Sequence, residues 1–293
     1  MTNRTPQRYL GLMGRSDERS PEIDRLVDEA GDRLDEGDAD AALELARRGA
    51  KLARRAGDRD AAAALALLEG IALSDLGSPV EALARLDEAV RARPDDVDAL
   101  LHRGLALYEL CRFEEAREQL LAVLRSAPHE AWAHHTLGLI AERRGDAAEA
   151  ARLFARARRE SPEEFPRPVA LSPDAFDRAL EDALASIPDS VGKYLSNVAI
   201  AVEDFPRSED LLGPDPPLSP SILGVFRGAP LGQKASMDPW SHFPSSIVLY
   251  QKNLERFARD RRELIEQIGV TLVHEVGHFL GLDEEDLWER GLG

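Results

Sequence analysis

The chain has 293 residues, 43% hydrophobic and 31% charged, which is the balance of a folded protein large enough for two cores. Its 54 acidic and 37 basic residues give a net charge of −17, which argues against binding to nucleic acid or an anionic membrane. A single cysteine excludes an internal disulfide, and no segment resembles a signal sequence or a membrane span, so we expect a cytoplasmic protein.

The first elements in chain order form an irregular helix pair. Residues 1–19 are polar and are expected to be disordered. A pair of helices then follows, with Gly37 at the turn and Ala42 at a small-residue position. The next turn, at Gly77, lies 40 residues further on, so the second helix of this pair should be longer than the others.

A 34-residue repeat organises the chain from about residue 63 to residue 164. Each repeat carries a glycine, a turn, an alanine, a large apolar residue and a proline in the same register. The glycine or alanine allows two helices to cross closely, the large residue is expected to fill the gap between neighbouring pairs, and the proline ends the second helix. These positions are Gly70, Gly104 and Gly138; Gly77, Cys111 and Gly145; Ala82, Ala116 and Ala150; Leu86, Leu120 and Phe154; and Pro94, Pro128 and Pro162.

This register resembles a tetratricopeptide repeat array, which implies an α-solenoid domain over residues 20–164. In such arrays the first helix of each pair lines the concave face. That face would be an apolar groove suited to a hydrophobic peptide, a protein partner or the second domain of the same chain, although ordinary packing between repeats uses the same residue types. The residues in register are Leu101, Leu105, Tyr108, Trp132, His135, Leu139 and Arg143.

Closely spaced prolines predict a stiff linker over residues 165–172, followed by a second domain over 173–293. Its sequence predicts a helix over 174–187 and a strand over 197–204. Two further short strands are expected at Leu223–Arg227 and Ser246–Tyr250, the second being a candidate edge strand for pairing with an extended peptide.

The last long helix contains a candidate metal site. Asp260 and Glu263 can form a capping box at its start, and Gly281 can end it. Within it, His274 and His278 are one turn apart on one face, a spacing that lets two imidazoles bind one zinc ion. Glu275 projects beside the metal, where a general base can take a proton from a water whose pKa zinc lowers to about 7.

A third metal ligand is expected shortly after the helix. Gly281 allows the chain to reverse, so Glu284 can return to the metal, with Asp283 and Asp286 as alternatives. The same acids would also be well placed to cap a short following helix.

Several segments together resemble the minimal zincin-like metallopeptidase family of bacteria: Leu223–Gly232, Ile247–Tyr250, Asp260–Leu264 and His274–His278. The resemblance covers about residues 173–290 and implies a small α+β domain in which a twisted sheet packs against the zinc-bearing helix. It implies that His274 and His278 are ligands, that Glu275 is the base and that Glu284 occupies the acidic position. The family usually has aspartate there, and no methionine follows to form a methionine turn.

The sequence therefore predicts a zinc-dependent metallopeptidase whose repeats recruit a substrate or partner. A different reading is a tetratricopeptide adaptor whose zincin-like domain is structural or binds metal without catalysis. A third is a repeat domain that blocks the metal cleft until a partner displaces it.

Overall fold

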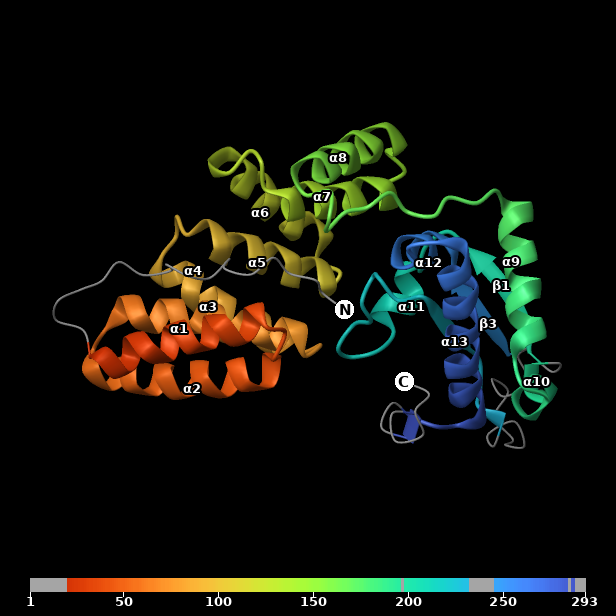
Figure 1. The fold of residues 1–293 in the computed structure, drawn as a ribbon, viewed down its shortest axis with the longest axis horizontal. Coiled ribbons are helices and arrows are strands. Elements are labelled where there is room, and N and C mark those ends of the chain that lie inside the picture. The colour runs from red at the N-terminus through yellow and green to blue at the C-terminus, as the bar shows by residue number, and fades with distance from the viewer. Residues whose placement is uncertain (1–19, 196–197, 232–244, 284–285, 288–293) are drawn as a thin grey trace. The chain divides into compact units, whose positions relative to one another are not determined.

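The protein divides into two compact units, Met1–Phe165 and Pro166–Gly293, which we describe separately. The computed structural model describes residues 20–195, 198–231, 245–283 and 286–287, and Figure 1 shows how the elements follow one another. None of the helices in these ranges is both long enough and apolar enough to cross a membrane.

The described part of the first unit is built of helices, which lie in antiparallel pairs. In each of the three regular pairs the second helix ends two residues before its proline, as predicted. The second helix of the first pair has 18 residues and is the longest of the four second helices, also as predicted. The helices are α1 (Pro21–Asp35), α2 (Ala39–Ala56), α3 (Arg59–Asp75), α4 (Pro79–Ala92), α5 (Val97–Glu109), α6 (Phe113–Ser126), α7 (Ala131–Arg143) and α8 (Ala147–Glu160).

Each pair turns through a residue in the left-handed backbone conformation, at the positions that the repeat register predicts. The φ angles are 80° at Gly37, 72° at Gly77, 58° at Cys111 and 79° at Gly145. Cys111 is the non-glycine residue among them, and a side chain in this conformation carries a steric cost that glycine avoids.

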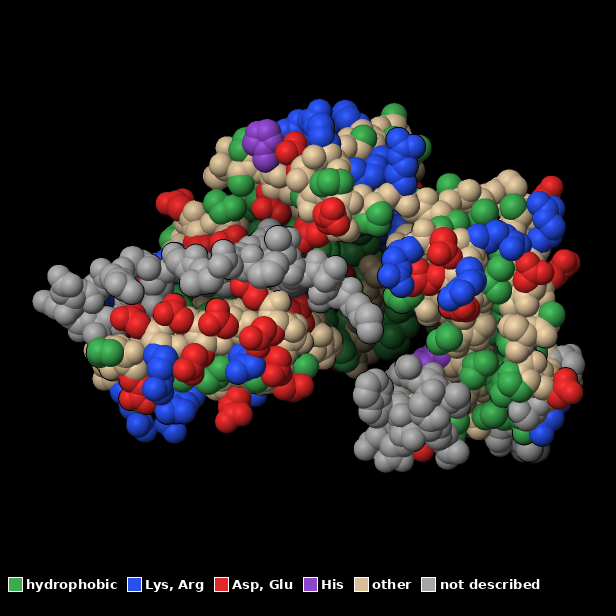
Figure 2. Space-filling view, in the orientation of Figure 1, with side chains coloured by type: hydrophobic (Ala, Val, Ile, Leu, Met, Phe, Trp, Pro, Cys, Tyr) green, Lys and Arg blue, Asp and Glu red, His purple; other side chains and the backbone are tan. Residues whose placement is uncertain are grey.

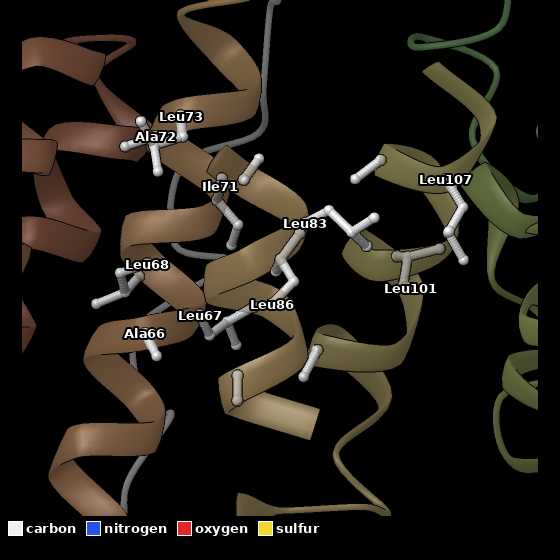
Figure 3. Close-up of a cluster of buried hydrophobic side chains, with 14 of the residues drawn as sticks. Ala66, Leu67, Leu68, Ile71, Ala72, Leu73, Leu83, Leu86, Leu101 and Leu107 are labelled. Atoms are coloured by element: carbon white, nitrogen blue, oxygen red, sulfur yellow. The ribbon is translucent and has the colours of Figure 1, made fainter. Parts of the chain in front are cut away.

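The repeat glycines are sites of close helix contact. A Cβ atom on Gly70 would lie 2.6 Å from Leu86 Cγ, and one on Gly104 would lie 2.8 Å from Leu120 Cδ2. The large apolar residue thus packs on the glycine of its own helix pair. This contact was not predicted from the sequence, because the large residue was assigned to the gap between neighbouring pairs. Figure 3 shows the side chains of α3, α4 and α5 converging in one continuous core.

Substitution of Gly104 by alanine should destabilise the repeats by about 1–3 kcal/mol, because the new methyl group overlaps a fully buried leucine. Thermal unfolding followed by circular dichroism measures the change. In the double variant with Leu120→Ala, which removes the overlapping atoms, the loss should be smaller than the sum of the two single losses. Additive losses would show that the two residues do not meet.

Charged side chains cover the outside of the first unit. Figure 2 shows acidic and basic groups intermixed over α1 and α2. One pair joins these helices, Arg48 Nη2 to Glu22 Oε1 at 3.1 Å, and both side chains are half exposed. Exposed pairs of this kind contribute little to stability, so the repeats depend chiefly on their apolar core.

The second unit is a three-stranded mixed sheet with helices packed against it. The strand order is β1-β3-β2, with β1 parallel and β2 antiparallel to β3. Its core includes Phe176 of α9, Leu249 of β3 and Leu272 of α13. The elements are α9 (Pro173–Ser186), α10 (Asp189–Leu195), β1 (Ala199–Glu203), α11 (Ser208–Leu212), β2 (Gly224–Arg227), β3 (Ser246–Tyr250), α12 (Gln251–Phe257) and α13 (Arg261–Leu280).

The prediction that Ser246–Tyr250 is an edge strand was wrong. This strand, β3, lies in the centre of the sheet and pairs on both sides, and Ile247 to Tyr250 are each at most 1% exposed. A continuous apolar run is typical of a strand buried on both faces. Among the described strands, β2 is the edge strand that lies next to α13.

Part of the predicted linker is held against the second unit. Val169 N–H donates to the carbonyl of Glu255 at 3.1 Å, and Leu171 N–H donates to Glu255 Oε1 at 2.9 Å. The side chain of Gln251 donates to the same carboxylate oxygen and to the carbonyl of Leu171. Glu255 is 3% exposed, so these hydrogen bonds satisfy a carboxylate that is otherwise costly to bury.

A cluster of charged residues ties the edge strand to the rest of the sheet. The guanidinium of Arg227 in β2 donates to Glu203 of β1 at 2.9 Å and to Asp210 of α11 at 2.6 Å, and Tyr250 O–H donates to Asp210 at 3.0 Å. The hydrogen bond from Arg227 lowers the pKa of Glu203. Burial raises the pKa of Asp210, but hydrogen bonds from Arg227 and Tyr250 outweigh it, so the net shift is downward.

These two depressed pKa values predict that the second unit is destabilised by acid. Below about pH 4 the unfolded chain binds protons that folded Glu203 and Asp210 still exclude, so stability falls as the pH drops from 5 to 3. Hydrogen exchange of peptides from β2 and β3, measured between pH 5 and 3, follows this loss of stability. Arg227→Gln should reduce the pH dependence, whereas Arg152→Gln, at an exposed pair in the repeats, should leave it unchanged.

Candidate metal centre

The helix that carries the histidines has well-defined ends. Asp260 Oδ1 accepts a hydrogen bond from Glu263 N–H at 2.9 Å, so Asp260 caps the helix as predicted. The capping box is not completed, because Glu263 accepts the N–H of Arg259, at 2.7 Å. At the other end Gly281 has φ 90° and donates to the carbonyl of His278, as predicted for a left-handed C-terminal residue.

The two histidines direct the same ring atom toward one point. His274 Nε2 lies 3.2 Å from His278 Nε2, and the ring centroids are 4.8 Å apart at an interplanar angle of 85°. His278 Nδ1 lies 3.1 Å from the carbonyl oxygen of Leu282, to which it can only donate. That hydrogen bond leaves the lone pair on Nε2 of the neutral ring, the atom that faces His274.

This arrangement fits a zinc ion. Two nitrogens bound to one tetrahedral zinc at the usual bond length are about 3.3 Å apart, close to the separation of the two Nε2 atoms. Hydrogen bonding of the second ring nitrogen to a backbone carbonyl is also the usual outer contact of a zinc-binding histidine. The donor set therefore has the chemistry and the spacing for zinc.

Glu275 is buried beside the histidine pair and under the edge strand. It is 5% exposed, and a Cβ atom built on Gly224 of β2 would lie 3.5 Å from its Cγ. The same Cβ would lie 2.6 Å from Cγ2 of Thr271, also buried, so only glycine lets the strand approach α13 this closely. Gly224 thus sets the distance between the edge strand and the predicted base.

A pocket of about 490 Å³ brings these residues together. His274, Glu275 and His278 all line it, so the structure places the three predicted motif residues at one cavity. One wall is α13 and the other is β2 with the segment before it. The remaining lining residues are Leu218, Ile222, Leu223, Gly224, Val225, Phe226, Gln267, Val270 and Thr271.

The predicted third ligand, Glu284, lies outside the described residues. The two alternatives cap each other: Asp283 Oδ1 accepts from Asp286 N–H at 2.9 Å, and Asp286 Oδ2 accepts from Asp283 N–H at 3.4 Å. Within the described ranges, no three His, Cys, Asp or Glu side chains are grouped to hold a metal. Asp283 and Asp286 are therefore placed as capping residues, and Glu284 stays a prediction.

The segment after Gly281 is anchored on the histidine helix. Leu287 is fully buried, and its side chain occupies the space that a Cβ atom on Gly277 would need. Gly277 lies between the two histidines in the sequence, so Leu287 packs at the level of the candidate site. This contact returns the chain to α13 shortly after the segment that contains Glu284.

The residues predicted to line a groove in the repeats occupy two different environments. Leu101 and Tyr108 are 1% and 5% exposed and belong to the core, which differs from the prediction, because these positions of α5 face the neighbouring helices. The other five are half-buried: Leu105, Trp132, His135, Leu139 and Arg143.

The chain's own Phe165 covers part of the predicted groove. Its ring stacks on His135 with centroids 4.5 Å apart and meets Trp132 edge-on at 4.9 Å. Phe165 is 7% exposed, so the aromatic surface at the end of the repeats is largely used within the first unit.

Sequence reasoning missed three residues of the site: Gly224, Thr271 and Leu287. A glycine inside a strand pattern signals a close approach of the backbone, which could have pointed to Gly224. Nothing in the local pattern marks Thr271 or Leu287, since their roles depend on contacts with distant segments.

Comparisons with known proteins agree with the division of the chain into a repeat unit and a second unit that carries the histidines. A model of the zincin-like metallopeptidase family matches residues 195–292, and a tetratricopeptide repeat model matches residues 67–131 and 109–165. No curated protein matches the chain significantly.

Among solved structures, MamA from Desulfovibrio magneticus RS-1, from residue 41 to its end, is 24% identical with a TM-score of 0.41, over 50% of this chain and 78% of that one. YrrB, described as a TPR protein with an unusual peptide-binding site, is 21% identical with a TM-score of 0.35, over 49% and 86%. The two family models thus match tetratricopeptide repeats over residues 67–165 and a zincin-like metallopeptidase domain over residues 195–292.

Proposed function

We propose that the chain is a zinc-dependent metallopeptidase. The observation that carries the proposal is the pair of histidine Nε2 atoms, 3.2 Å apart, at a pocket that Glu275 also lines. The family match supplies independent support, since it covers this motif.

Each residue of the site has a separate task in this proposal. His274, His278 and Glu284 hold the ion, and Leu282 fixes the ring of His278 through its carbonyl. Zinc supplies a Lewis acid that favours attack of water on a peptide carbonyl. The carboxylate of Glu275 accepts a proton from the attacking water and passes it to the leaving amine nitrogen.

The edge strand would align the substrate. Leu223 accepts from Tyr250 N–H at 2.9 Å, and hydrogen-bonded pairs alternate along an antiparallel ladder. Gly224 and Phe226 therefore direct their backbone N–H and C=O groups away from β3, toward the edge of the sheet on which no described strand pairs. An extended peptide can pair there, at the mouth of the pocket that the histidines line.

The repeats would recruit a protein partner or the substrate itself. Leu105, Trp132, His135 and Leu139 are the proposed contact residues, since each is only half-buried in the first unit. A partner with an aromatic or aliphatic anchor would compete with Phe165 for the faces of Trp132 and His135.

Metal analysis combined with peptide cleavage tests the proposed activity. Purified protein should contain about one zinc per chain, and His274→Ala should lose it, whereas His134→Ala in the repeats should retain it. A proteome-derived peptide library should be cleaved by the zinc-loaded protein, not after chelation, and again after zinc is restored. Zinc binding without cleavage, with and without the repeats, would instead favour an adaptor with a metal-binding domain.

A further inference from the structure

We propose that a groove between the second helices of the last two repeats binds an acidic segment of a partner protein, which places one large apolar side chain in it. The groove lies over α7, between α6 and α8, and has a volume of about 480 Å³. None of the four contact residues proposed for the repeats lines it. The groove is therefore a second surface of the repeats, and its binding depends neither on zinc nor on cleavage.

The floor of the groove is apolar at positions that are polar in the preceding repeat. There, Arg103 of α5 donates to Asp87 of α4 at 2.6 Å and to Gln119 of α6 at 2.9 Å. This side chain bridges the two neighbouring second helices and closes the space between them. The equivalent positions 34 residues later are three leucines, which cannot form such a bridge: Leu121, Leu137 and Leu153.

The repeat before that one is also closed by charged residues. Glu69 of α3 stands in register with Arg103 and accepts a hydrogen bond from Arg47 of α2 at 3.1 Å. The last repeat thus departs from both earlier ones. Leu121 is 36% exposed as a result, and it adjoins two buried leucines in the groove. A single exposed leucine is common on proteins, but an exposed leucine that continues an apolar groove is typical of a binding surface.

Three arginines surround this apolar floor. Arg117 of α6 is exposed, and none of the described acidic residues forms a close ion pair with it. Arg144 lies 3.7 Å from Glu114, beyond a hydrogen bond, and Arg152 is the third. Figure 2 shows basic side chains gathered over α8, whereas acidic and basic groups are intermixed over α1 and α2. The charge around the groove therefore favours an acidic ligand.

The two acidic residues of the lining are already engaged. Glu149 accepts hydrogen bonds from Arg152 at 2.7 and 2.9 Å, and Asp146 caps α8 by accepting the N–H of Glu149 at 3.0 Å. Arg117 and Arg144 are left to pair with a ligand. Because the whole chain carries a net charge of −17, an acidic segment would be repelled by most of its surface and attracted at this groove.

The dimensions agree with one large side chain as the anchor. A volume of about 480 Å³ lies in the usual range for ligand sites and exceeds that of a leucine or phenylalanine side chain. An anchor of this kind would cover Leu121 and remove its exposed surface from water, which supplies affinity. The arginines at the rim would supply the preference for acidic neighbours.

Titration of labelled peptides against the full chain tests the proposal. The probe has a central leucine flanked by glutamates and aspartates, and two control peptides replace either the leucine by serine or the acids by lysine. The probe should bind about ten- to hundred-fold more tightly than either control, as measured by fluorescence anisotropy. Its affinity should fall about ten-fold as the salt concentration rises from about 50 to 500 mM.

Neutral substitutions locate the binding site on the protein. Leu121→Gln should weaken binding of the probe about ten-fold, and Arg117→Gln should weaken it several-fold. Both residues are exposed, so the fold should survive either change. The matched changes Val80→Gln, at a residue that is 54% exposed, and Arg55→Gln, at an exposed residue of α2, should leave the affinity unaltered.

A copy of the polar bridge gives a second test. Leu121→Asp, Leu137→Arg and Leu153→Gln in one chain reproduce the preceding repeat, so the probe should no longer bind while circular dichroism remains helical. Equal affinities for the three peptides, unchanged binding by Leu121→Gln, or absence of any binding of the probe overturns the proposal. If sedimentation shows a dimer that Leu121→Gln dissociates, the groove joins two copies of the chain and the acidic partner is wrong.

Discussion

Replacement of Glu275 by glutamine is expected to lower peptide cleavage by about 10²–10⁴-fold while the zinc content stays unchanged. Glutamine has the same shape and can remain buried beneath β2, but its amide cannot accept the proton of the attacking water. The loss should appear in kcat rather than KM, because the side chain acts in the transition state and not in holding the peptide.

The matched control for this change is Glu263→Gln in the same helix. Glu263 is partly exposed, pairs with Arg259 and does not line the pocket, so its replacement removes one carboxylate from α13 without touching the pocket. Cleavage by this variant should stay close to that of the wild-type protein. Equal activity of wild type and Glu275→Gln, with zinc confirmed in both, would remove Glu275 from the proposed mechanism.

Alanine at Gly277 should weaken both the fold of the second unit and its hold on zinc. The new methyl group would occupy the position of the buried Leu287 side chain, at a cost of about 1–3 kcal/mol. Displacement of Leu287 also releases the segment after Gly281, which contains Glu284, so zinc affinity should fall about 10–100-fold. Competition with a chromogenic chelator measures the affinity, and denaturant unfolding measures the stability.

Gly269 provides an internal comparison, because it lies in the same helix with open space where its Cβ would be. Gly269→Ala should stabilise the second unit by about 0.5–1 kcal/mol through helix propensity and leave zinc affinity unchanged. If the two alanine variants behaved alike, the contact between Gly277 and Leu287 would have no part in the site.

The repeat unit could be predicted in detail because its determinants are local. A glycine, a turn residue and a proline at the helix end recur at a fixed spacing, as Gly70 and Gly104 illustrate, although the contact of Gly104 with Leu120 was not predicted. Each pair is defined by residues close in sequence, so the period of the pattern gives the register of the helices.

The second unit was predicted less completely because its contacts join distant segments. The histidine motif and the cap residue Asp260 are local features of one helix, and both lie as expected. The place of β3 in the sheet depends on which strands pair with it, which its own apolar sequence does not specify. The approach of Gly224 to Thr271 joins positions 47 residues apart, and no periodicity marks it.

The packing of Phe165 on Trp132 and His135 has a practical consequence for dissecting the protein. A fragment that stops at Pro162, where the repeat period ends, would leave those two rings uncovered and prone to self-association. A fragment that continues through Phe165 keeps the ring that covers Trp132 and His135, so it should remain monodisperse. Expression trials of the isolated solenoid are therefore best designed three residues longer than the repeat length alone indicates.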